Sequence, residues 1–367
     1  MQWDNSPVYR RRRRAALALV LALLVLLVWA LSSLVKALTP DDSSPEIAAG
    51  VPAPWVRSGK APQITLAFAG DVQAHKSAGR INEEGLGETG KVLAAADLAM
   101  INLETVVADD LAGLSPQPKP FTFATTPKIL DSLKNEGVDV VTAANNHTMD
   151  FGDEGMRRML EVKQDSPVPM VGLGKDDAEA WAPWTTEVKG RKVVVFGATD
   201  VLDAHLDWKA APGKRGLAKV KDEEGFTKLL DAVRQARAAS SDDAIVVYLH
   251  SGSELVQCPT ERQQETSRRL AEAGADVVIG SHAHILQTTG TRGNTAIAYG
   301  MGNFVFGSGA EQTRATGVLT VTVPGGQGAP TTDFAPARIT KGLPELLDGA
   351  AKDEAMARWK GLGQGCS

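Results

Sequence analysis

The chain has 367 residues, of which 43% are hydrophobic and 23% are charged, as in a globular protein that can bury a core. The formal net charge is −5, but the first 36 residues contribute +5 (Arg10 to Arg14 and Lys36, less Asp4), so residues 37–367 carry −10. This acidic remainder has no basic stripe of the kind that nucleic acid requires, which argues against a nucleic-acid partner.

A membrane anchor is predicted near the N-terminus. Arg10 to Arg14 precede a 21-residue run, Ala15 to Val35, in which only Ser32 and Ser33 are polar. At about 1.5 Å per residue such a helix spans a hydrocarbon core of roughly 30 Å, whereas a cleaved signal peptide has an apolar region of only about 7–15 residues. The arginines hold their end in the cytoplasm by the positive-inside rule. We therefore expect a cytoplasmic tail (1–14), a single-pass transmembrane helix (15–36) in the cell membrane and an extracytoplasmic remainder.

The extracytoplasmic part is predicted to be one α/β domain on a linker. Residues 37–62 are rich in Pro, Ser, Gly and Ala without periodicity and indicate a linker. Residues 63–345 alternate apolar runs with amphipathic segments, which is typical of an α/β layered domain, and residues 346–367 indicate a C-terminal tail helix. Strands are predicted at 64–69, 98–104, 138–141, 192–198, 245–249, 276–279 and 295–298, and helices at 88–95, 126–137, 153–163, 223–239 and 260–274. Gly317 to Val323 alternates like an antiparallel edge strand.

Chemically active side chains follow the ends of these strands. The residues at strand ends are His75, His147, His250, His282 and His284, together with Asp71, Glu104 and Asn146. The sixth histidine, His205, lies in a polar stretch and is interpreted as a surface residue. Asn145-Asn146 followed by Asp150 could be only a tight turn that caps the next helix, because Asn and Asp bond their own backbone there. The clustering of histidines at strand ends favours a functional site at the rim of a sheet.

This set of side chains indicates a metal site. Imidazoles with carboxylates and an amide oxygen, without cysteine, suit a divalent ion such as Mn, Fe or Zn. His282 and His284 lie on the same side of an extended segment, so both can reach one ion. Asp71 or Glu104 could bridge two ions that bind a phosphoryl-type anion and activate water. A histidine outside the metal ligands could then protonate the leaving group, and His147 is the natural candidate.

Ordered motifs make the resemblance to a known family specific. They are Gly70-Asp71, Asn102-Leu-Glu104, Ala144-Asn-Asn-His147 with Asp150 and Gly152, His250-x-Gly252-x-Glu254, Gly274-Ala-Asp276, Gly280-x-His-x-His284 with Gln287, and Gly302-Asn-Phe304. Over about residues 64 to 306 the chain resembles the CapA family of capsule and poly-γ-glutamate biosynthesis proteins. That family is itself similar to the calcineurin-like metallophosphoesterases.

The resemblance implies a four-layer α/β/β/α metallophosphoesterase-like sandwich with two divalent metal ions at one edge. The metal ligands it implies are Asp71, His75, Glu104, Asn146, His250, His282 and His284. It also implies that His147 is the catalytic acid and that Asn145, Glu254 and Asn303 contact substrate. The chain departs from the family pattern at Ala283, where proline is usual, and at Met301, where leucine is common. The related phosphoesterases begin with Asp-x-His, whereas His75 here lies four residues after Asp71.

Two functions follow as hypotheses. The first is a metal-dependent hydrolase or transferase in capsule or poly-γ-glutamate-type synthesis, acting on a phosphoester or a γ-glutamyl amide of an anionic polymer or its activated precursor. The second is a non-catalytic accessory subunit that binds and exports the polymer with a membrane synthase complex. The complete set of ligand-type residues, with His147 beyond them, favours the first.

Cys258 and Cys366 are predicted to form a disulfide, because both lie in the part placed outside the cytoplasm, where thiols tend to oxidise. Such a bond would close a loop of 108 residues and pin the C-terminal tail to the domain. The alternative is that both cysteines are incidental, with Cys258 buried.

Overall fold

The computed structural model describes residues 55–203, 208–307 and 309–366. The predicted membrane anchor, most of the predicted linker and His205 lie outside these residues. Within the described ranges, no helix combines the length and the apolar character that crossing a bilayer requires.

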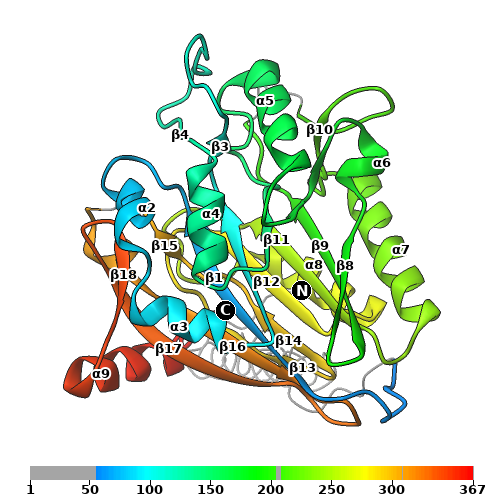
Figure 1. The fold of residues 1–367 in the computed structure, drawn as a ribbon. Coiled ribbons are helices and arrows are strands. Elements are labelled where there is room, and N and C mark those ends of the chain that lie inside the picture. Colours follow the sequence, from blue (N-terminus) through cyan, green and yellow to red (C-terminus); the bar gives the residue numbers. More distant parts are fainter. Residues whose placement is uncertain (1–54, 204–207, 308, 367) are drawn as a thin grey trace, which may run out of the picture. The chain divides into compact units, whose positions relative to one another are not determined.

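Two mixed β-sheets form the centre of the domain (Figure 1). The first sheet has the order β18 (Leu343–Leu346), β17 (Thr331–Thr340), β16 (Ala315–Val323), β1 (Ile64–Val72), β2 (Leu98–Leu103), β5 (Val140–Thr142) and β6 (Met170–Val171), with β15 (Asn303–Val305) also paired to β1. The second has the order β13 (Thr289–Arg292), β14 (Thr295–Ala298), β12 (Val277–His282), β11 (Ala244–Ser251), β9 (Arg191–Thr199) and β8 (Trp184–Val188). Strands β1, β2, β5 and β6 are parallel, as are β9, β11, β12 and β14.

The two sheets face each other across an apolar core, and helices cover their outer faces. Along β1, Leu66 and Phe68 pack in the core between the sheets, whereas Ala67 and Ala69 pack in the core under the helices. Burial on both faces explains why this strand is almost continuously apolar instead of alternating. The layers are therefore helices, sheet, sheet and helices, in the predicted α/β/β/α order.

The helices follow the predicted positions closely. The first sheet is covered by α2 (Ile81–Glu84), α3 (Glu88–Ala94), α4 (Lys128–Asn135) and α5 (Gly152–Gln164), and the second by α7 (Glu223–Ala239) and α8 (Glu261–Ala273). Short elements complete the described fold: 3₁₀ turns η1 (Lys76–Arg80) and η2 (Glu311–Thr313), helices α6 (Asp177–Ala180) and α9 (Gly349–Lys360), and the strand pairs β3 (Val106–Val107) with β4 (Ala124–Thr125) and β7 (Leu173–Gly174) with β10 (Gly216–Leu217). Thr260 and Gln263 form the capping box that starts α8, and Gly274 ends the helix at φ +114°.

The prediction that Gly317 to Val323 is an edge strand is wrong. This segment lies in β16, which is hydrogen-bonded to β1 on one side and to β17 on the other. Alternating burial reports which faces of a strand are covered, whereas edge position depends on its hydrogen-bonded neighbours. Strand β17, which provides the second neighbour of β16, and strand β18 beyond it were not predicted from the sequence.

The described end of the predicted linker packs against the domain. Arg57 is 1% exposed, and its Nε donates to Oδ1 of the buried Asp276 at 3.1 Å. Arg237 Nη2 lies 2.5 Å from the other oxygen of Asp276. The ring of Trp55 contacts both guanidinium groups, with centroid distances of 4.9 Å to Arg57 and 4.1 Å to Arg237. A buried carboxylate shared by two arginines thus fixes the start of the described chain before β1.

Cys258 and Cys366 form the predicted disulfide, with Cα atoms 5.4 Å apart. The tail before Cys366 also contacts the domain through α9, where Trp359 stacks on Phe334 of β17 at a centroid distance of 4.9 Å. This helix, Gly349–Lys360, lies within the predicted tail-helix segment 346–367. In the chain-entropy model, closing a loop of 108 residues stabilises a protein by up to about 4–5 kcal/mol. The bond therefore fixes the C-terminal tail beside the loop that follows β11.

Candidate metal centre

Side chains from both sheets meet at the carboxyl ends of the parallel strands. Asp71 lies near the end of β1 and Glu104 directly follows β2, while His250 and His282 lie in the last residues of β11 and β12. All four are buried. The carboxyl ends of parallel strands share one edge of a sheet, which is where α/β proteins bind ligands. Stacking two sheets brings carboxylates from the first opposite imidazoles from the second.

Asn102 of β2 links the two sheets at this edge. Its Nδ2 donates to Asp71 Oδ1 at 2.7 Å and lies 3.1 Å from Nδ1 of His250. Its Oδ1 accepts a hydrogen bond from Nδ2 of Asn145 at 3.1 Å. The side chain of Asn102 therefore orients one carboxylate and one imidazole at the same time.

A close backbone contact fixes the position of Asp71. A Cβ on Gly70 would lie 1.8 Å from the carbonyl oxygen of Gly302, so only glycine fits there. The amide of Asp71 donates to this same oxygen at 2.9 Å. Asp71 also pairs in register with Asn303 of β15, whose Oδ1 lies 2.8 Å from Nδ1 of His284. The Gly70-Asp71 and Gly302-Asn303 motifs thus support each other structurally.

Glu104, Asn146 and His250 offer ligand atoms at short mutual distances. Nε2 of His250 lies 3.3 Å from Oε1 of Glu104 and 2.8 Å from Oδ1 of Asn146. Two ligand atoms that are each about 2.1 Å from one cation, at right angles, lie about 3 Å apart. Nδ1 of His250 lies 3.1 Å from the hydroxyl oxygen of Ser281, so the hydroxyl helps to hold the imidazole with Nε2 directed at Glu104 and Asn146.

The ligand-type side chains form overlapping groups. In each of three groups the ligand atoms lie within 4.8 Å of one another: Glu104 with His250 and His282, Asp71 with Glu104 and His284, and Glu254 with His282 and His284. His282 and His284 have φ values of +95° and +56°, a backbone region that costs non-glycine residues on the order of 1–3 kcal/mol. Such strain persists where the surrounding structure fixes it, and here it holds both rings in the cluster.

The electrostatics of the cluster favour a cation. Burial raises the pKa of Glu104 well above its usual range, and the nearby charge of Asp71 raises it further. Burial and the neighbouring His284 lower the pKa of His282 to about 3. For His284 burial also disfavours the charged form, but Glu104 and Asp71 outweigh it and raise the pKa to about 10. Two buried carboxylates therefore attract positive charge into the cluster.

Unpaired buried atoms provide a test of whether a metal fits here. Three buried atoms have no hydrogen-bond partner among the described residues: both carboxylate oxygens of Glu104 and Nδ1 of His282. Leaving a buried polar group unpaired costs about 1–3 kcal/mol, and more for a charged one. Carboxylate and imidazole are ligands of Mn, Fe and Zn, so the side chains fit a bound divalent cation.

Comparison with known proteins identifies the family of this chain. The model of the family "Bacterial capsule synthesis protein PGA_cap" matches residues 65–308, a range that contains Asp71 and every other residue of the overlapping groups. The chain belongs to the PGA_cap family. The resemblance inferred from the ordered motifs is thereby confirmed.

Relatives of this PGA_cap protein carry CapA names. "PGA biosynthesis protein CapA" of Bacillus subtilis is 27% identical over 258 residues, which cover 68% of this chain but only 65% of that protein. "Capsule biosynthesis protein CapA" of Bacillus anthracis is 24% identical over 295 residues, which cover 78% of this chain and 70% of that protein. A solved structure described as a novel phosphatase from Mycoplasma pneumoniae covers 80% of this chain and 97% of its own at 14% identity and a TM-score of 0.48, a similarity that carries no argument about activity.

His147 of this PGA_cap protein lies beside the metal-ligand groups in a separate network. Its Nδ1 lies 2.8 Å from Oδ2 of Asp150, and its ring lies 4.4 Å from that of Phe123 between centroids. The amide of Phe123 donates to the same Asp150 oxygen at 2.6 Å. Burial lowers the pKa of His147, and the contact with Asp150 opposes this shift. A proton on Nδ1 faces Asp150, which leaves Nε2 as the nitrogen that can exchange a proton.

Lys119 is a part of this network that the sequence did not reveal. Its Nζ lies 2.8 Å from Oδ1 of Asp150 and 3.0 Å from Oδ2 of Asp203, and it donates to the backbone oxygen of Asn146 at 2.7 Å. Lys119 therefore holds both the partner of His147 and the segment that carries Asn146. It comes from an irregular proline-rich loop of the PGA_cap domain, where no periodic pattern distinguishes it.

The predicted substrate residues of the PGA_cap domain differ in their exposure. Asn145 is fully buried, and its Oδ1 accepts from the amides of His147 and Thr148 at 3.0 Å each. Asn303 is 1% exposed and bonds His284 and the backbone of Thr313. Both side chains thus position other parts of the site. Glu254 is exposed and belongs to the group with His282 and His284.

The structure does not bring His75 into the three metal-ligand groups. Its ring lies 5.9 Å from that of Phe123 between centroids. The residues on either side, Ala74 and Lys76, have φ values of +47° and +51°, so the chain turns sharply after β1. A histidine four residues after Asp71 therefore faces the proline-rich loop.

Proposed function

We propose that this PGA_cap protein is a metal-dependent hydrolase or transferase that acts on an anionic polymer, or its activated precursor, during capsule or poly-γ-glutamate synthesis. The observation that carries this proposal is the carboxylate of Glu104, which is buried without a hydrogen-bond partner in the described structure and lies among imidazoles. The printed names of the two Bacillus relatives support the biological setting.

The side chains divide into binding and proton-transfer roles. Asp71, Glu104, Asn146, His250, His282 and His284 would hold two divalent ions, with Glu104 shared between overlapping groups. Ions in this position supply Lewis-acid stabilisation of a phosphoryl or carbonyl oxygen and a water of lowered pKa. His147 carries the proton for the leaving group on Nε2, while Asp150 and Lys119 hold its ring in place.

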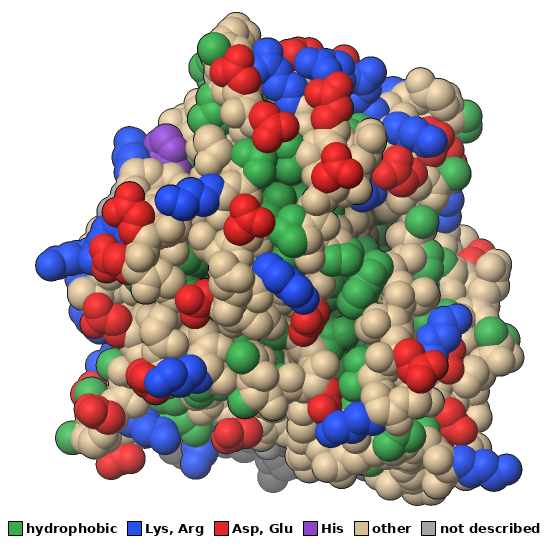
Figure 2. All heavy atoms as spheres, viewed as in Figure 1, with side chains coloured by type: hydrophobic (Ala, Val, Ile, Leu, Met, Phe, Trp, Pro, Cys, Tyr) green, Lys and Arg blue, Asp and Glu red, His purple; other side chains and the backbone are tan. Residues whose placement is uncertain are grey.

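The surface outside the cluster gives the polymer little general attraction. Residues 37–367 carry a net charge of −10, by difference between the whole chain and its basic N-terminal segment. On the face shown in Figure 2, basic and acidic side chains are interspersed. An anionic substrate therefore has to be bound locally, where a cation outweighs the repulsion of the acidic domain.

Hydrolysis of a generic phosphodiester tests the proposal. The purified full-length protein should hydrolyse bis(4-nitrophenyl) phosphate, lose this activity on treatment with a chelator and regain it with Mn²⁺ or Zn²⁺. Activity that is unchanged by complete removal of divalent ions would contradict a metal-dependent reaction.

A non-catalytic accessory role is the second candidate. A relative from Mycobacterium tuberculosis, 26% identical over 214 residues, is named "Probable polyglutamine synthesis accessory protein". In this case the same metals would bind the polymer and pass it from a membrane synthase complex to the exterior. Metal-bound protein without turnover on phosphodiesters or γ-glutamyl amides would favour this role over the enzyme.

We also propose that the domain is extracytoplasmic and anchored in the bilayer by residues 15–36. The five arginines before the apolar run and the disulfide between Cys258 and Cys366 support this orientation. Alkaline phosphatase, which folds actively only outside the cytoplasm, should be active when fused after Ser367. A fusion that is inactive there, while a cytoplasmic reporter at the same position works, would reverse the orientation.

A further inference from the structure

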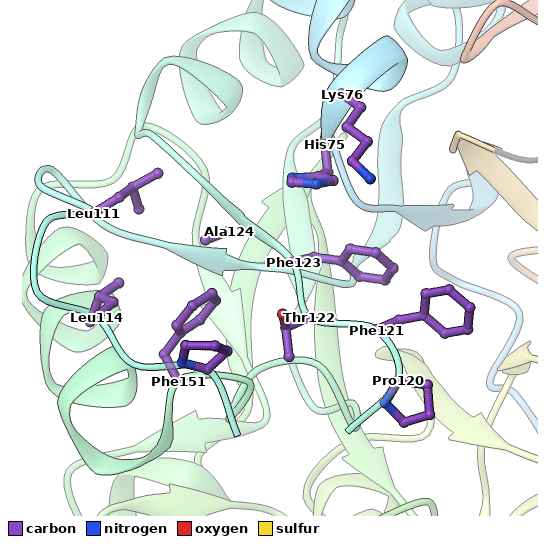
Figure 3. A pocket seen from close by; sticks show the side chains of 11 residues that line it. His75, Lys76, Leu111, Leu114, Pro120, Phe121, Thr122, Phe123, Ala124 and Phe151 are labelled. Carbon is purple, nitrogen blue, oxygen red and sulfur yellow. The ribbon is translucent and has the colours of Figure 1, made fainter. Parts of the chain in front are cut away.

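A pocket of about 470 Å³ lies beside the candidate metal centre, and Figure 3 shows its lining. Eight of its eleven lining residues are apolar, among them Leu111, Leu114 and Phe121. The loop between β3 and β4 supplies most of the wall, Phe151 comes from the start of α5, and His75 and Lys76 lie at the other end. Its volume is within the usual range of small-molecule sites.

A single aromatic ring connects this pocket to the catalytic groups. Phe123 lines the pocket, and its ring lies 4.4 Å from that of His147 between centroids. Phe123 also lies 6.0 Å from Phe306, whose ring lies 5.0 Å from that of His284. A group in the pocket is therefore separated from the proton donor His147 by the ring of Phe123, and from His284 of the metal-ligand cluster by the rings of Phe123 and Phe306.

The lining does not suit a stretch of bare polyanion. Moving a carboxylate from water to an apolar surface is costly unless it is paired, and among the described residues the pocket offers one cation for this purpose, Lys76. Lys76 is exposed and makes no ion pair within the described ranges, and burial lowers the pKa of His75, so His75 is neutral near pH 7. Phe121 is 69% and Leu111 is 38% exposed, which leaves apolar surface available to a ligand.

From this combination we propose that the pocket binds the apolar part of an amphiphilic anion, a substrate in which an aliphatic chain is attached to a phosphate or carboxylate. Lys76 and the metal centre hold the anionic group, and the loop carrying Leu111, Leu114 and Phe121 covers the chain. The proposal rests on the proposed function for the position of the reacting group, since it places the chain beside His147. It specifies the class of substrate more closely than the proposed function does: an anion that carries a lipid-like aliphatic chain, which a polyanionic polymer by itself lacks.

Alkyl phosphates of different chain length test the pocket directly. Full-length protein in lipid nanodiscs is titrated with ethyl phosphate and octyl phosphate, and binding to empty discs is subtracted. Each buried methylene should tighten binding by roughly fourfold. Burial of only about two of the additional methylenes of octyl phosphate should therefore make it bind at least about tenfold more tightly than ethyl phosphate. Phe121→Ser should lose most of this preference, and Lys76→Gln should weaken both ligands while keeping it.

A matched control is Val56→Ser, which also removes an exposed apolar side chain. Val56 precedes Arg57, which pairs with Asp276 just before β12, so it lies at the opposite end of that strand from His282. It should keep the full chain-length preference, and Leu111→Ser provides a second pocket variant if Phe121→Ser unfolds early. Equal affinity of wild type for both phosphates, or an unchanged preference in both pocket variants, would overturn the proposal. Octyl phosphate that binds only to the discs would also overturn the proposal, because the apolar surface would then contact the bilayer. Self-association of the protein that covers the pocket would overturn it too, because the apolar surface would then bind a second copy.

Failure of the pocket and failure of the proposed reaction are separable. Phosphodiester hydrolysis without a chain-length preference would reject the proposed ligand of the pocket and would be consistent with the proposed reaction. A chain-length preference without hydrolysis would support the proposed ligand of the pocket and would reject the proposed catalytic function.

Discussion

Replacing His147 with alanine is expected to lower turnover by about 10²–10⁴-fold, the usual contribution of a general acid, while the protein keeps its metals. The reason is geometric: Nδ1 of His147 is occupied by Asp150, and His147 belongs to none of the three metal-ligand groups in the described structure. Turnover of a phosphodiester with a poor leaving group, such as a dialkyl ester, should fall more than turnover of a nitrophenyl ester, because a poor leaving group depends more on protonation.

Asp150→Asn is the matched comparison for this variant. It keeps the shape of the side chain but removes the charge that orients the imidazole, so it should cause a smaller loss than His147→Ala. If His147→Ala instead loses its metals, His147 is a ligand and the assignment of the acid is wrong.

Replacing Glu104 with glutamine should have opposite effects on activity and on the stability of the metal-free protein. Removing a ligand should weaken metal binding by more than the roughly 10–100-fold that loss of an outer-shell partner costs, and turnover should fall with it. Burial raises the pKa of Glu104, so in the metal-free protein its charged form destabilises the fold at pH values above the ordinary range of a glutamate. Glutamine removes this charge without changing the volume.

Thermal unfolding near pH 8 measures this effect. With a chelator present, Glu104→Gln should unfold at a higher temperature than wild type, whereas with divalent ions present wild type should be the more stable. The exposed Glu254→Gln is the control and should show a much smaller change in the metal-free state. A lower Tm for metal-free Glu104→Gln would mean that the carboxylate is satisfied by the protein itself.

The sequence predicted which side chains gather in the candidate cluster better than it predicted their arrangement. Parallel strands end at a common edge, so His250 and His282 could be expected close together from their positions after apolar runs. That Glu104 and Asn146 face them across the sandwich could not be read from the strands, because period-2 patterns do not tell which sheets stack. The ordered motifs supplied this information through the family resemblance.

Local sequence patterns carried no information on how His75 and Lys119 would be placed relative to their neighbours in the fold. His75 follows β1 as His250 ends β11, but Ala74 and Lys76 adopt positive φ values and turn the chain toward the proline-rich loop. Lys119 became visible only in three dimensions, since it acts through Asp150 from a loop without periodicity. The Asn145-Asn146 pair fits both interpretations offered for it: Asn145 caps the turn, and Asn146 reaches His250.

The metal content of the purified full-length protein tests the central claim most directly. Elemental analysis should find about two divalent transition-metal ions per chain, because the overlapping groups around Glu104 provide ligands for two adjacent positions. The double variant His282→Ala/His284→Ala should lose most of this metal while remaining folded. Wild-type protein without transition metal, or a double variant with unchanged metal content, would contradict the metal centre proposed here.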